Sequence, residues 1–333
     1  MQLSEIREYL LGKDDEKLFS LAEKTRNKYT GKKVYLRAII EFSNICRNNC
    51  KYCGIRRDAK IKRYAMSCEE IVKCAQYAED LGYGTVVLQS GENSIYDDKM
   101  IKIIKEIKET TDLAIVLSIG EKSYHLYLKY KLAGADRYLL KQETSNPELF
   151  YHLTGRNLKK RFECLKILKK LGYEVGSGNI VGLPWQRISD LIEDILSFVK
   201  WNFDMLGIGP FIPCPNTPLR NYPPGDAMLT LRVIALSRIL TKNAHIPATT
   251  AIRSVVGEKD LIFKCGANVV MGNVTPEKYR KLYKIYPGKV CFFQDPEVWL
   301  NNIKELIKSV GLKPSGERGD SLKNSRKASI KSI

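Results

Sequence analysis

Three cysteines, Cys46, Cys50 and Cys53, fall within eight residues of the chain with the spacing C-x3-C-x2-C. This spacing allows three thiolates from a single loop to bind one inorganic centre, and thiolates favour soft metals and iron–sulfur clusters. A structural zinc site or an ordinary ferredoxin-type cluster needs a fourth protein ligand. No such ligand lies close by outside the next expected helix, and the nearest histidine is His125. The motif therefore favours a 4Fe–4S cluster with one iron open to a small molecule.

An aromatic residue, Tyr52, precedes the last cysteine, and an apolar segment precedes the whole motif. In this arrangement the motif resembles the signature of the radical S-adenosylmethionine (SAM) superfamily. The resemblance implies that the three cysteines bind one 4Fe–4S cluster and that the amino and carboxylate groups of SAM chelate its open iron. It also implies that one electron cleaves SAM to a 5′-deoxyadenosyl radical. A structural zinc is the competing interpretation, and the missing fourth ligand argues against it.

The rest of the chain alternates between short apolar runs and amphipathic stretches, which is the pattern of βα units with buried parallel strands. We expect eight strands, at residues 35–42, 85–89, 113–118, 137–141, 174–181, 204–208, 245–250 and 268–271. The helix after the cysteine motif opens with a capping box, Ser67 followed by Glu70. Further helices are expected at 97–109, 123–133, 158–171, 189–200, 229–240 and 298–310. Eight such units predict an α/β fold, a (β/α)8 TIM-type barrel with right-handed crossovers.

The barrel is expected to fill most of the chain. Residues 1–31 carry apolar residues at near-helical spacing, which predicts an N-terminal helical cap packed on the barrel. Residues 32–312 form the expected radical SAM (β/α)8 barrel. Residues 313–333 are polar, basic and rich in glycine and serine, so we expect a mobile tail without a catalytic role.

Polar residues and glycines follow each expected strand, at the end where a (β/α)8 barrel carries its active site. The resemblance implies that the SAM-binding set is Tyr52, Ser90, Gly91, Glu92, Ser118, Glu143, Arg161, Ile180 and Val181. The segment 90–92 would hold the amino group of SAM. Glu143 and Arg161 would hold its other polar ends, with the guanidinium as a fork for the carboxylate. Tyr52 and the backbone at 180–182 would flank the adenine.

Four later segments resemble a narrower family, the HydE-type maturases of iron–iron hydrogenase, whose relatives include biotin synthase and methylornithine synthase. These segments are 208–213, 246–251, 266–271 and 282–289, and the resemblance spans residues 30–322. It implies an anionic, amino-acid-like substrate, which in that family is a cysteine-bound iron carbonyl–cyanide complex. The catalytic and substrate-binding side chains would be Gln89, Lys141, Thr249, Thr250 and Tyr286.

Two positions depart from that family's pattern. Lys141 stands where the family usually has arginine, so the charge is kept but the bidentate fork is lost. The segment 142–144, Gln-Glu-Thr, resembles the methylornithine synthase branch instead. The substrate is therefore less constrained than the radical chemistry. A radical SAM amino-acid mutase or sulfur-insertion enzyme, methylornithine synthase-like or biotin synthase-like, is the second interpretation.

The chain carries a net charge of +18 at pH 7, so a basic, zinc-bearing nucleic-acid-binding protein is the third interpretation. The lysines are spread along the expected helices, however, and we find no stripe of interleaved basic and aromatic residues of the kind that single-strand binders use. We therefore expect no nucleic-acid partner. The resemblance implies a reduced ferredoxin- or flavodoxin-type electron donor and other hydrogenase maturases as partners, and a positive field would attract such an acidic donor.

The chain shows no apolar run of about 18 residues, and its N-terminus lacks the pattern of a signal peptide. Nine cysteines in a chain of this length do not suggest a disulfide scaffold, so we expect a cytoplasmic enzyme without membrane association. No C-x2-C follows Cys53, which predicts a single cluster. Cys68, Cys74 and Cys164 are expected to be packed thiols. For Cys214, just past the sixth strand, both a thiol facing the barrel mouth and an ordinary loop thiol stay open.

Overall fold

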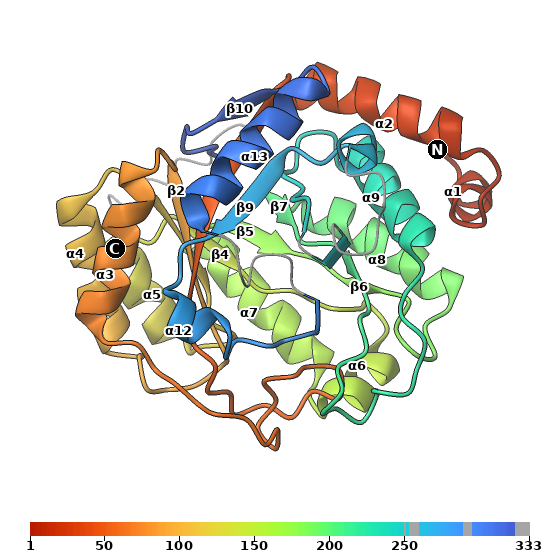
Figure 1. Ribbon diagram of the computed structural model, residues 1–333. Helices are drawn as coiled ribbons and strands as arrows, with labels where there is room; N and C mark the ends of the chain where they lie inside the picture. The colour runs from red at the N-terminus through yellow and green to blue at the C-terminus, as the bar shows by residue number, and fades with distance from the viewer. Residues whose placement is uncertain (250, 253–259, 289–294, 324–333) are drawn as a thin grey trace.

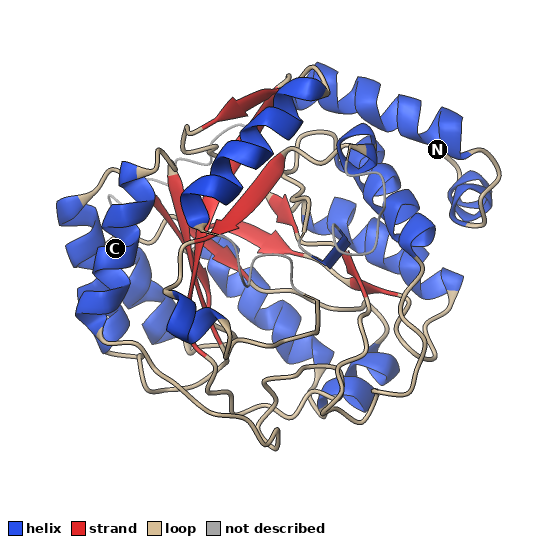
Figure 2. Cartoon of the chain, in the orientation of Figure 1, coloured by secondary structure: helices blue, strands red, loops and turns tan. Residues whose placement is uncertain are grey.

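The computed structural model of the chain describes residues 1–249, 251–252, 260–288 and 295–323. Parallel strands lie at its centre and helices surround them (Figure 1 and Figure 2). Two helices, α1 (Leu3–Leu10) and α2 (Asp15–Thr30), cover the residues expected to form the N-terminal cap and contact α9 (Ala227–Thr241). The Arg232 guanidinium of α9 donates to both carboxylate oxygens of Asp15 at 2.7 Å, which ties α2 to the outside of the barrel.

Within the described residues, six strands follow one another around the sheet and a further strand pairs back with the first, all in parallel. In sequence order the six are β1 (Lys33–Ser43), β2 (Thr85–Ser90), β3 (Ala114–Ser118), β4 (Arg137–Leu139), β5 (Glu174–Ser177) and β7 (Met205–Leu206). The strand that pairs back with β1 is β9 (Val269–Asn273). A second pair, β6 (Ile180–Val181) with β8 (Gly209–Pro210), continues β5 and β7 beyond their ends.

The gap between β7 and β9 is bridged by the segment 245–248. His245 forms a parallel bridge with Met205, and Pro247 forms one with Val269. This short segment replaces the longer strand expected at 245–250, and Thr250 lies outside the described residues. With the segment 245–248 included, the ring contains an extended segment at each of the eight expected strand positions. The prediction of a (β/α)8-type barrel is therefore confirmed.

Alternate residues of a barrel strand face opposite sides of the sheet. Val86 and Leu88 of β2 belong to the large core between the strands and the helices. Val87, between them, packs with Val116 and Met205 in a separate apolar group inside the ring. Both sides of the strand are therefore apolar, which explains why its sequence is a continuous apolar run instead of an alternating one.

The helices α3 (Cys68–Asp80), α4 (Lys99–Thr110), α5 (Tyr124–Ala133), α7 (Leu158–Lys170), α8 (Ile188–Trp201), α9 and α13 (Pro296–Ser309) follow the expected pattern. The capping box at the start of α3 is confirmed by both of its hydrogen bonds. The short helices α6 (Pro147–Thr154) and α12 (Glu277–Arg280) were not expected, and α11 (Leu261–Lys264) is one turn. No helix in the described part of the chain is both long and apolar enough to cross a membrane.

The chain after residue 312 differs from the expectation of a mobile tail beginning at 313. Residues Lys313–Ser315 form β10, which pairs in parallel with β1. Beyond it, Asp320 accepts a hydrogen bond at 2.5 Å from the guanidinium of Arg137, which is fully buried and also donates to Glu174. The segment 313–323 is therefore packed against the amino-terminal end of the barrel, because it supplies the carboxylate that a buried arginine needs.

Candidate active site at the mouth of the barrel

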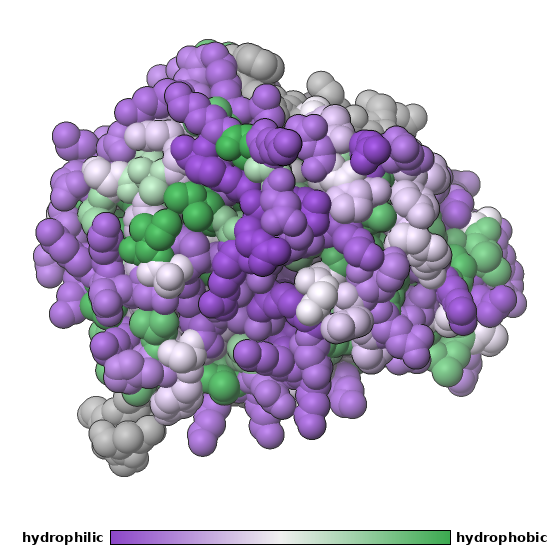
Figure 3. Space-filling view, turned by 90° about the horizontal axis from the view of Figure 1, so that it is seen from below, coloured by the Kyte–Doolittle hydropathy of each residue, from purple (hydrophilic) through white to green (hydrophobic). Residues whose placement is uncertain are grey.

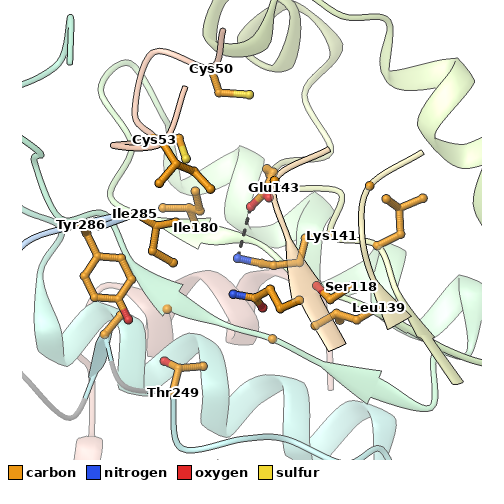
Figure 4. A pocket seen from close by; sticks show the side chains of 18 of the residues that line it. Cys50, Cys53, Ser118, Leu139, Lys141, Glu143, Ile180, Thr249, Ile285 and Tyr286 are labelled. Carbon is orange, nitrogen blue, oxygen red and sulfur yellow. Dashed lines mark ion pairs between the residues drawn. The ribbon is translucent and has the colours of Figure 1, made fainter. Parts of the chain in front are cut away.

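A cavity of about 410 Å³ opens at the carboxyl ends of the strands and runs into the ring. Cys50 and Cys53 lie at one end of it, Lys141 and Glu143 near its middle, and Thr249 towards the other end (Figure 4). The deepest part is apolar and ends at Arg37, which is buried beside Met205. The cavity thus joins a polar mouth to an apolar chamber.

The three motif cysteines are free, partly exposed and all line this cavity. Burial raises the pKa of each thiol, that of Cys50 to about 11. Among the described residues, no three Cys, His, Asp or Glu side chains converge closely enough to hold one metal ion. Three thiols that line one cavity are a ligand set that an iron–sulfur cluster can take.

Arg63 organises the loop that carries the cysteines. Its Nη1 donates to the carbonyl oxygens of Asn44 at 2.7 Å and Ile55 at 2.9 Å. Its Nη2 donates to the carbonyls of Arg56, at 2.6 Å, and of Arg57 and Ala59, both at 3.1 Å. One guanidinium therefore holds the backbone on both sides of the motif, since its rigid fork can serve several acceptors at once.

A second network joins the cysteine loop to the ends of β2 and β3. The buried Glu92 carboxylate accepts hydrogen bonds from Arg47 at 2.8 Å and from Arg156 at 3.1 Å. Glu121 pairs with Arg156 and with Arg161, whose Nε lies 2.7 Å from Glu121 Oε1. Burial alone would raise the pKa of Glu92, but the charge of Arg156 and the other donors outweigh burial and lower it. The carboxylate assigned to the SAM amino group is therefore ionised and already positioned by two arginines.

Lys141 and Glu143 form an ion pair inside the cavity, with Nζ and Oε2 3.2 Å apart (Figure 4). Within the described part of the chain Glu143 Oε2 accepts no hydrogen bond, so charge alone holds the pair. Glu143 has a φ of 62°, a left-handed conformation that is uncommon for a non-glycine residue. Its backbone N–H donates to Gly178 at 3.0 Å and its carbonyl accepts from Ile180 at 2.9 Å. These two hydrogen bonds connect the segment after β4 to residues 178–180, next to the backbone that would flank adenine.

Asp194 lies beneath these two segments and is fully buried. Its carboxylate accepts hydrogen bonds from the Asn179 side chain at 2.8 Å and from the Ser145 backbone N–H. Burial, opposed by these donors, raises the pKa of Asp194 to about 7. Gln142 is also fully buried and lies 3.5 Å from Asp194, so its departure from the family pattern faces the protein interior and not the ligand.

The predicted substrate-binding residues Gln89, Lys141, Thr249 and Tyr286 all line the cavity, and Thr250 lies outside the described residues. The predicted SAM-binding residues also line it, except Val181. The Val181 side chain is fully buried, and its carbonyl accepts from the Phe211 N–H at 2.8 Å.

Cys214 is buried beside Gly54, next to the cysteine loop, and is not among the lining residues. A methyl group added at Gly54 would lie 2.6 Å from its sulfur. Cys214 is thus a packed thiol behind the motif.

The sequence patterns did not point to Arg63, Arg156 or Asp194 as residues of the site. The partners of Arg156 and Asp194 are distant in the chain, for example 64 positions for Glu92 and Arg156 and 15 for Asn179 and Asp194. Arg63 serves backbone carbonyls, which no pattern of residue types identifies. For α6 a signal was present, since Asn146-Pro147-Glu148 has the form of an N-cap followed by proline at the first helical position.

The chain matches the family described as the Radical SAM superfamily over residues 40–197. It is 50% identical over 309 residues to the FeFe hydrogenase maturase subunit HydE of Thermotoga maritima, an alignment that covers 92% of this chain and 88% of that protein. It is 33% identical over 278 residues to the biotin synthase of Thermotoga neapolitana, covering 80% and 94% of the two chains. Among solved structures, methylornithine synthase superposes with a TM-score of 0.85 at 26% identity over 94% of both chains.

Proposed function

Because the chain belongs to the radical SAM superfamily, we propose that it acts in the maturation of the active-site cluster of FeFe hydrogenase. The 50% identity to a protein named as such a maturase, over 92% of this chain, carries the proposal. The cavity supports it, because three free thiols, the arginine-paired Glu92 and the Lys141–Glu143 pair line one space. The enzyme uses one 4Fe–4S cluster and SAM.

The residues present fit these cofactors. Cys46, Cys50 and Cys53 would hold the cluster, since thiolates are the ligands that such clusters take. When bound, the cluster and SAM supply a carbon-centred radical through one-electron cleavage of SAM. Glu92 offers a positioned anion for an ammonium group, and Arg161 a buried cation for a carboxylate.

The deeper chamber would take the substrate. Lys141 supplies a positive charge for an anionic group, while Gln89, Thr249 and Tyr286 add polar groups around it. The apolar side chains of Val87, Val116 and Met205 exclude water from the chamber. Exclusion of water protects a reactive species from side reactions. An amino-acid-like anion, such as an iron–cysteine complex, matches this combination of two cationic side chains, Lys141 and Arg37, with an apolar chamber.

A radical SAM amino-acid mutase is the second candidate, and the superposition with methylornithine synthase favours it. A biotin synthase-like sulfur insertion would need a second set of cluster ligands inside the barrel. Among the described residues that line the cavity, the only cysteines are those of the motif. This observation argues against sulfur insertion. A zinc-bearing nucleic-acid-binding protein is less favoured, because a structural zinc takes four protein ligands and three cysteines line the described part of the cavity.

The proposal is tested with anaerobically reconstituted protein. Inactive hydrogenase, incubated with the other maturases and reductant, should gain hydrogen-evolving activity only when this protein and SAM are added. Serine at any one of the three motif cysteines should abolish both cluster content and activation. Cys68→Ser is the matched control, because Cys68 is a partly exposed thiol on α3 outside the cavity. Conversion of lysine to methylornithine, without hydrogenase activation, would favour the mutase instead.

A further inference from the structure

Aromatic side chains are exposed directly beside the cysteine loop. The rings of His152 and Trp185 are 4.5 Å apart, and those of Trp185 and Tyr222 are 5.1 Å apart. Lys51, which follows Cys50, has its Nζ 3.4 Å from His152 Nε2. His152, Trp185 and Tyr222, which we call the aromatic strip, are therefore continuous with the cysteine motif, although they come from three segments of the chain. Of these side chains Trp185 is 53% exposed and Tyr222 38%.

The strip rests on a small apolar core separate from the main one. This core consists of Leu149, Leu153, Leu183, Phe211 and Leu219, with Tyr52 of the cysteine motif packed against it. Trp185 has a φ of 68°, which makes this bulky residue a genuine backbone outlier. Such strain persists only where the surrounding structure holds it, and it concentrates at functional positions. The exposed indole is thus presented by a strained turn next to the cysteines.

The cysteine loop adds positive charge. Between residues 44 and 67 the cations are Arg47, Lys51, Arg56, Arg57, Lys60, Lys62 and Arg63, and the only acidic residue is Asp58. Arg57 is well exposed and pairs with Asp58 at 3.0 Å, and its backbone N–H donates to the Asn48 carbonyl within the motif at 2.7 Å. Hydrophilic residues dominate the face of the molecule seen from the side of these loops (Figure 3). The cations of the loop and the aromatic side chains thus both adjoin the motif, and Lys51 lies next to His152 where they meet.

We propose that this surface docks a small acidic redox protein that delivers the electron for SAM cleavage; the inference rests on the proposed function. We call it the donor face, formed by Lys51, Arg57, Lys60, Trp185, Tyr222 and Tyr151, the last being 65% exposed and next to His152 on α6. Exposed aromatic anchors dominate the energetics of protein interfaces, and complementary charge speeds encounter and sets orientation. The donor gives up one electron, and SAM takes it up as it divides into methionine and the 5′-deoxyadenosyl radical.

The experiment compares two reductants on the full-length reconstituted enzyme, following 5′-deoxyadenosine formation from SAM. One reductant is a purified acidic ferredoxin kept reduced, and the other is dithionite, which is small and needs no docking surface. The first variant combines Lys51→Glu, Arg57→Glu and Lys60→Glu. The second is Trp185→Gly, because glycine tolerates the left-handed backbone.

The matched control reverses the same number of exposed charges on α4, away from the cysteine loop, as Lys99→Glu, Lys102→Glu and Lys105→Glu. Both donor-face variants should raise the apparent KM for ferredoxin, the charge reversal by about tenfold at low ionic strength and less at high salt. The α4 control should not change it. With dithionite, all variants should form 5′-deoxyadenosine within about twofold of the parent rate, since rim charges act on association.

An unchanged KM for ferredoxin in both donor-face variants, or an equal rise in the α4 control, would overturn the docking proposal alone. The proposal would also be overturned if the donor-face variants lost binding to a single-stranded RNA oligonucleotide while their KM for ferredoxin stayed unchanged. That result would assign the surface to nucleic acid. Failure of the parent enzyme to cleave SAM with dithionite would instead overturn the proposed function. The two failures are therefore distinguishable.

Discussion

Asn179 donates a hydrogen bond from its side-chain amide to the Asp194 carboxylate at 2.8 Å, and both side chains are fully buried. Asn179 precedes the segment that would flank adenine, and Asp194 also accepts from the Ser145 N–H, two residues after Glu143. One buried carboxylate on α8 thus joins two loops that would both contact SAM. This position makes Asp194 a positioning residue for the cofactor end of the site.

Asp194 should make stability depend on pH. Burial raises its pKa to about 7, above the value of about 3.9 expected in the unfolded chain. The folded state therefore binds the proton more tightly, so this contribution to stability is present at acidic pH and is lost as the pH rises to about 7. Between pH 5 and pH 8 the loss amounts to about 3 kcal/mol.

Asp194→Asn should remove this dependence, so the parent should lose more stability than the variant over that interval in urea unfolding. Glu193→Gln, an exposed neighbour on the same helix, is the control and should leave the pH dependence intact. Parallel pH curves for the parent and Asp194→Asn would contradict the assignment.

Replacing Arg63 should cost the enzyme its cluster. Arg63→Met removes a guanidinium that serves five carbonyls of the cysteine loop and leaves several of them without a donor. We expect iron and sulfide content after reconstitution to fall at least severalfold. Arg57→Met, an exposed arginine in the same loop, should keep the parent content. Equal cluster content in the two variants would show that Arg63 does not shape the loop.

Gly91 should not tolerate a side chain. A Cβ at this position would lie 2.4 Å from the Ile45 carbonyl oxygen and 2.8 Å from Cys46 Cβ, so Gly91→Ala should displace the first cysteine. Gly207→Ala is the matched control, because its nearest contact would be 3.7 Å, in ordinary van der Waals range. Iron content should fall in the first variant and not in the second. A Gly91→Ala enzyme with full cluster content would mean that the cysteine loop moves freely.

Asp320 should stabilise the barrel from its amino-terminal end. Asp320→Ala removes one of two carboxylates from the fully buried Arg137 guanidinium, and loss of a partner in a buried pair costs about 3 kcal/mol or more. Because Asp320 itself is 59% exposed, solvent screening should reduce the loss to about 1–2 kcal/mol. Glu317→Ala, in an exposed pair with Lys33, should change stability by less than about 0.5 kcal/mol. Equal melting temperatures for the two variants would contradict this role.

The candidate cluster ligands and the alternation of strands and helices could be predicted from the sequence, because both depend on residues near each other in the chain. The spacing of Cys46, Cys50 and Cys53 is a local property of one loop, and the structure places all three thiols on one cavity. The capping box of Ser67 and Glu70 likewise spans three residues and is present as expected. The positions of the eight strands could be predicted because strands buried on both faces have continuous apolar sequences.

What the sequence alone determined was therefore the chemistry of the motif, the class of the fold and the end of the barrel at which the site would lie. Tertiary structure decided which charges meet. Glu92 and Arg156 are 64 positions apart, Asp194 and Ser145 are 49 apart, and Arg137 and Asp320 are 183 apart. It also converted residues 313–323 from an expected tail into a packed strand and its continuation. Such pairings depend on how the chain closes over long separations, and no local pattern of residue types records that closure.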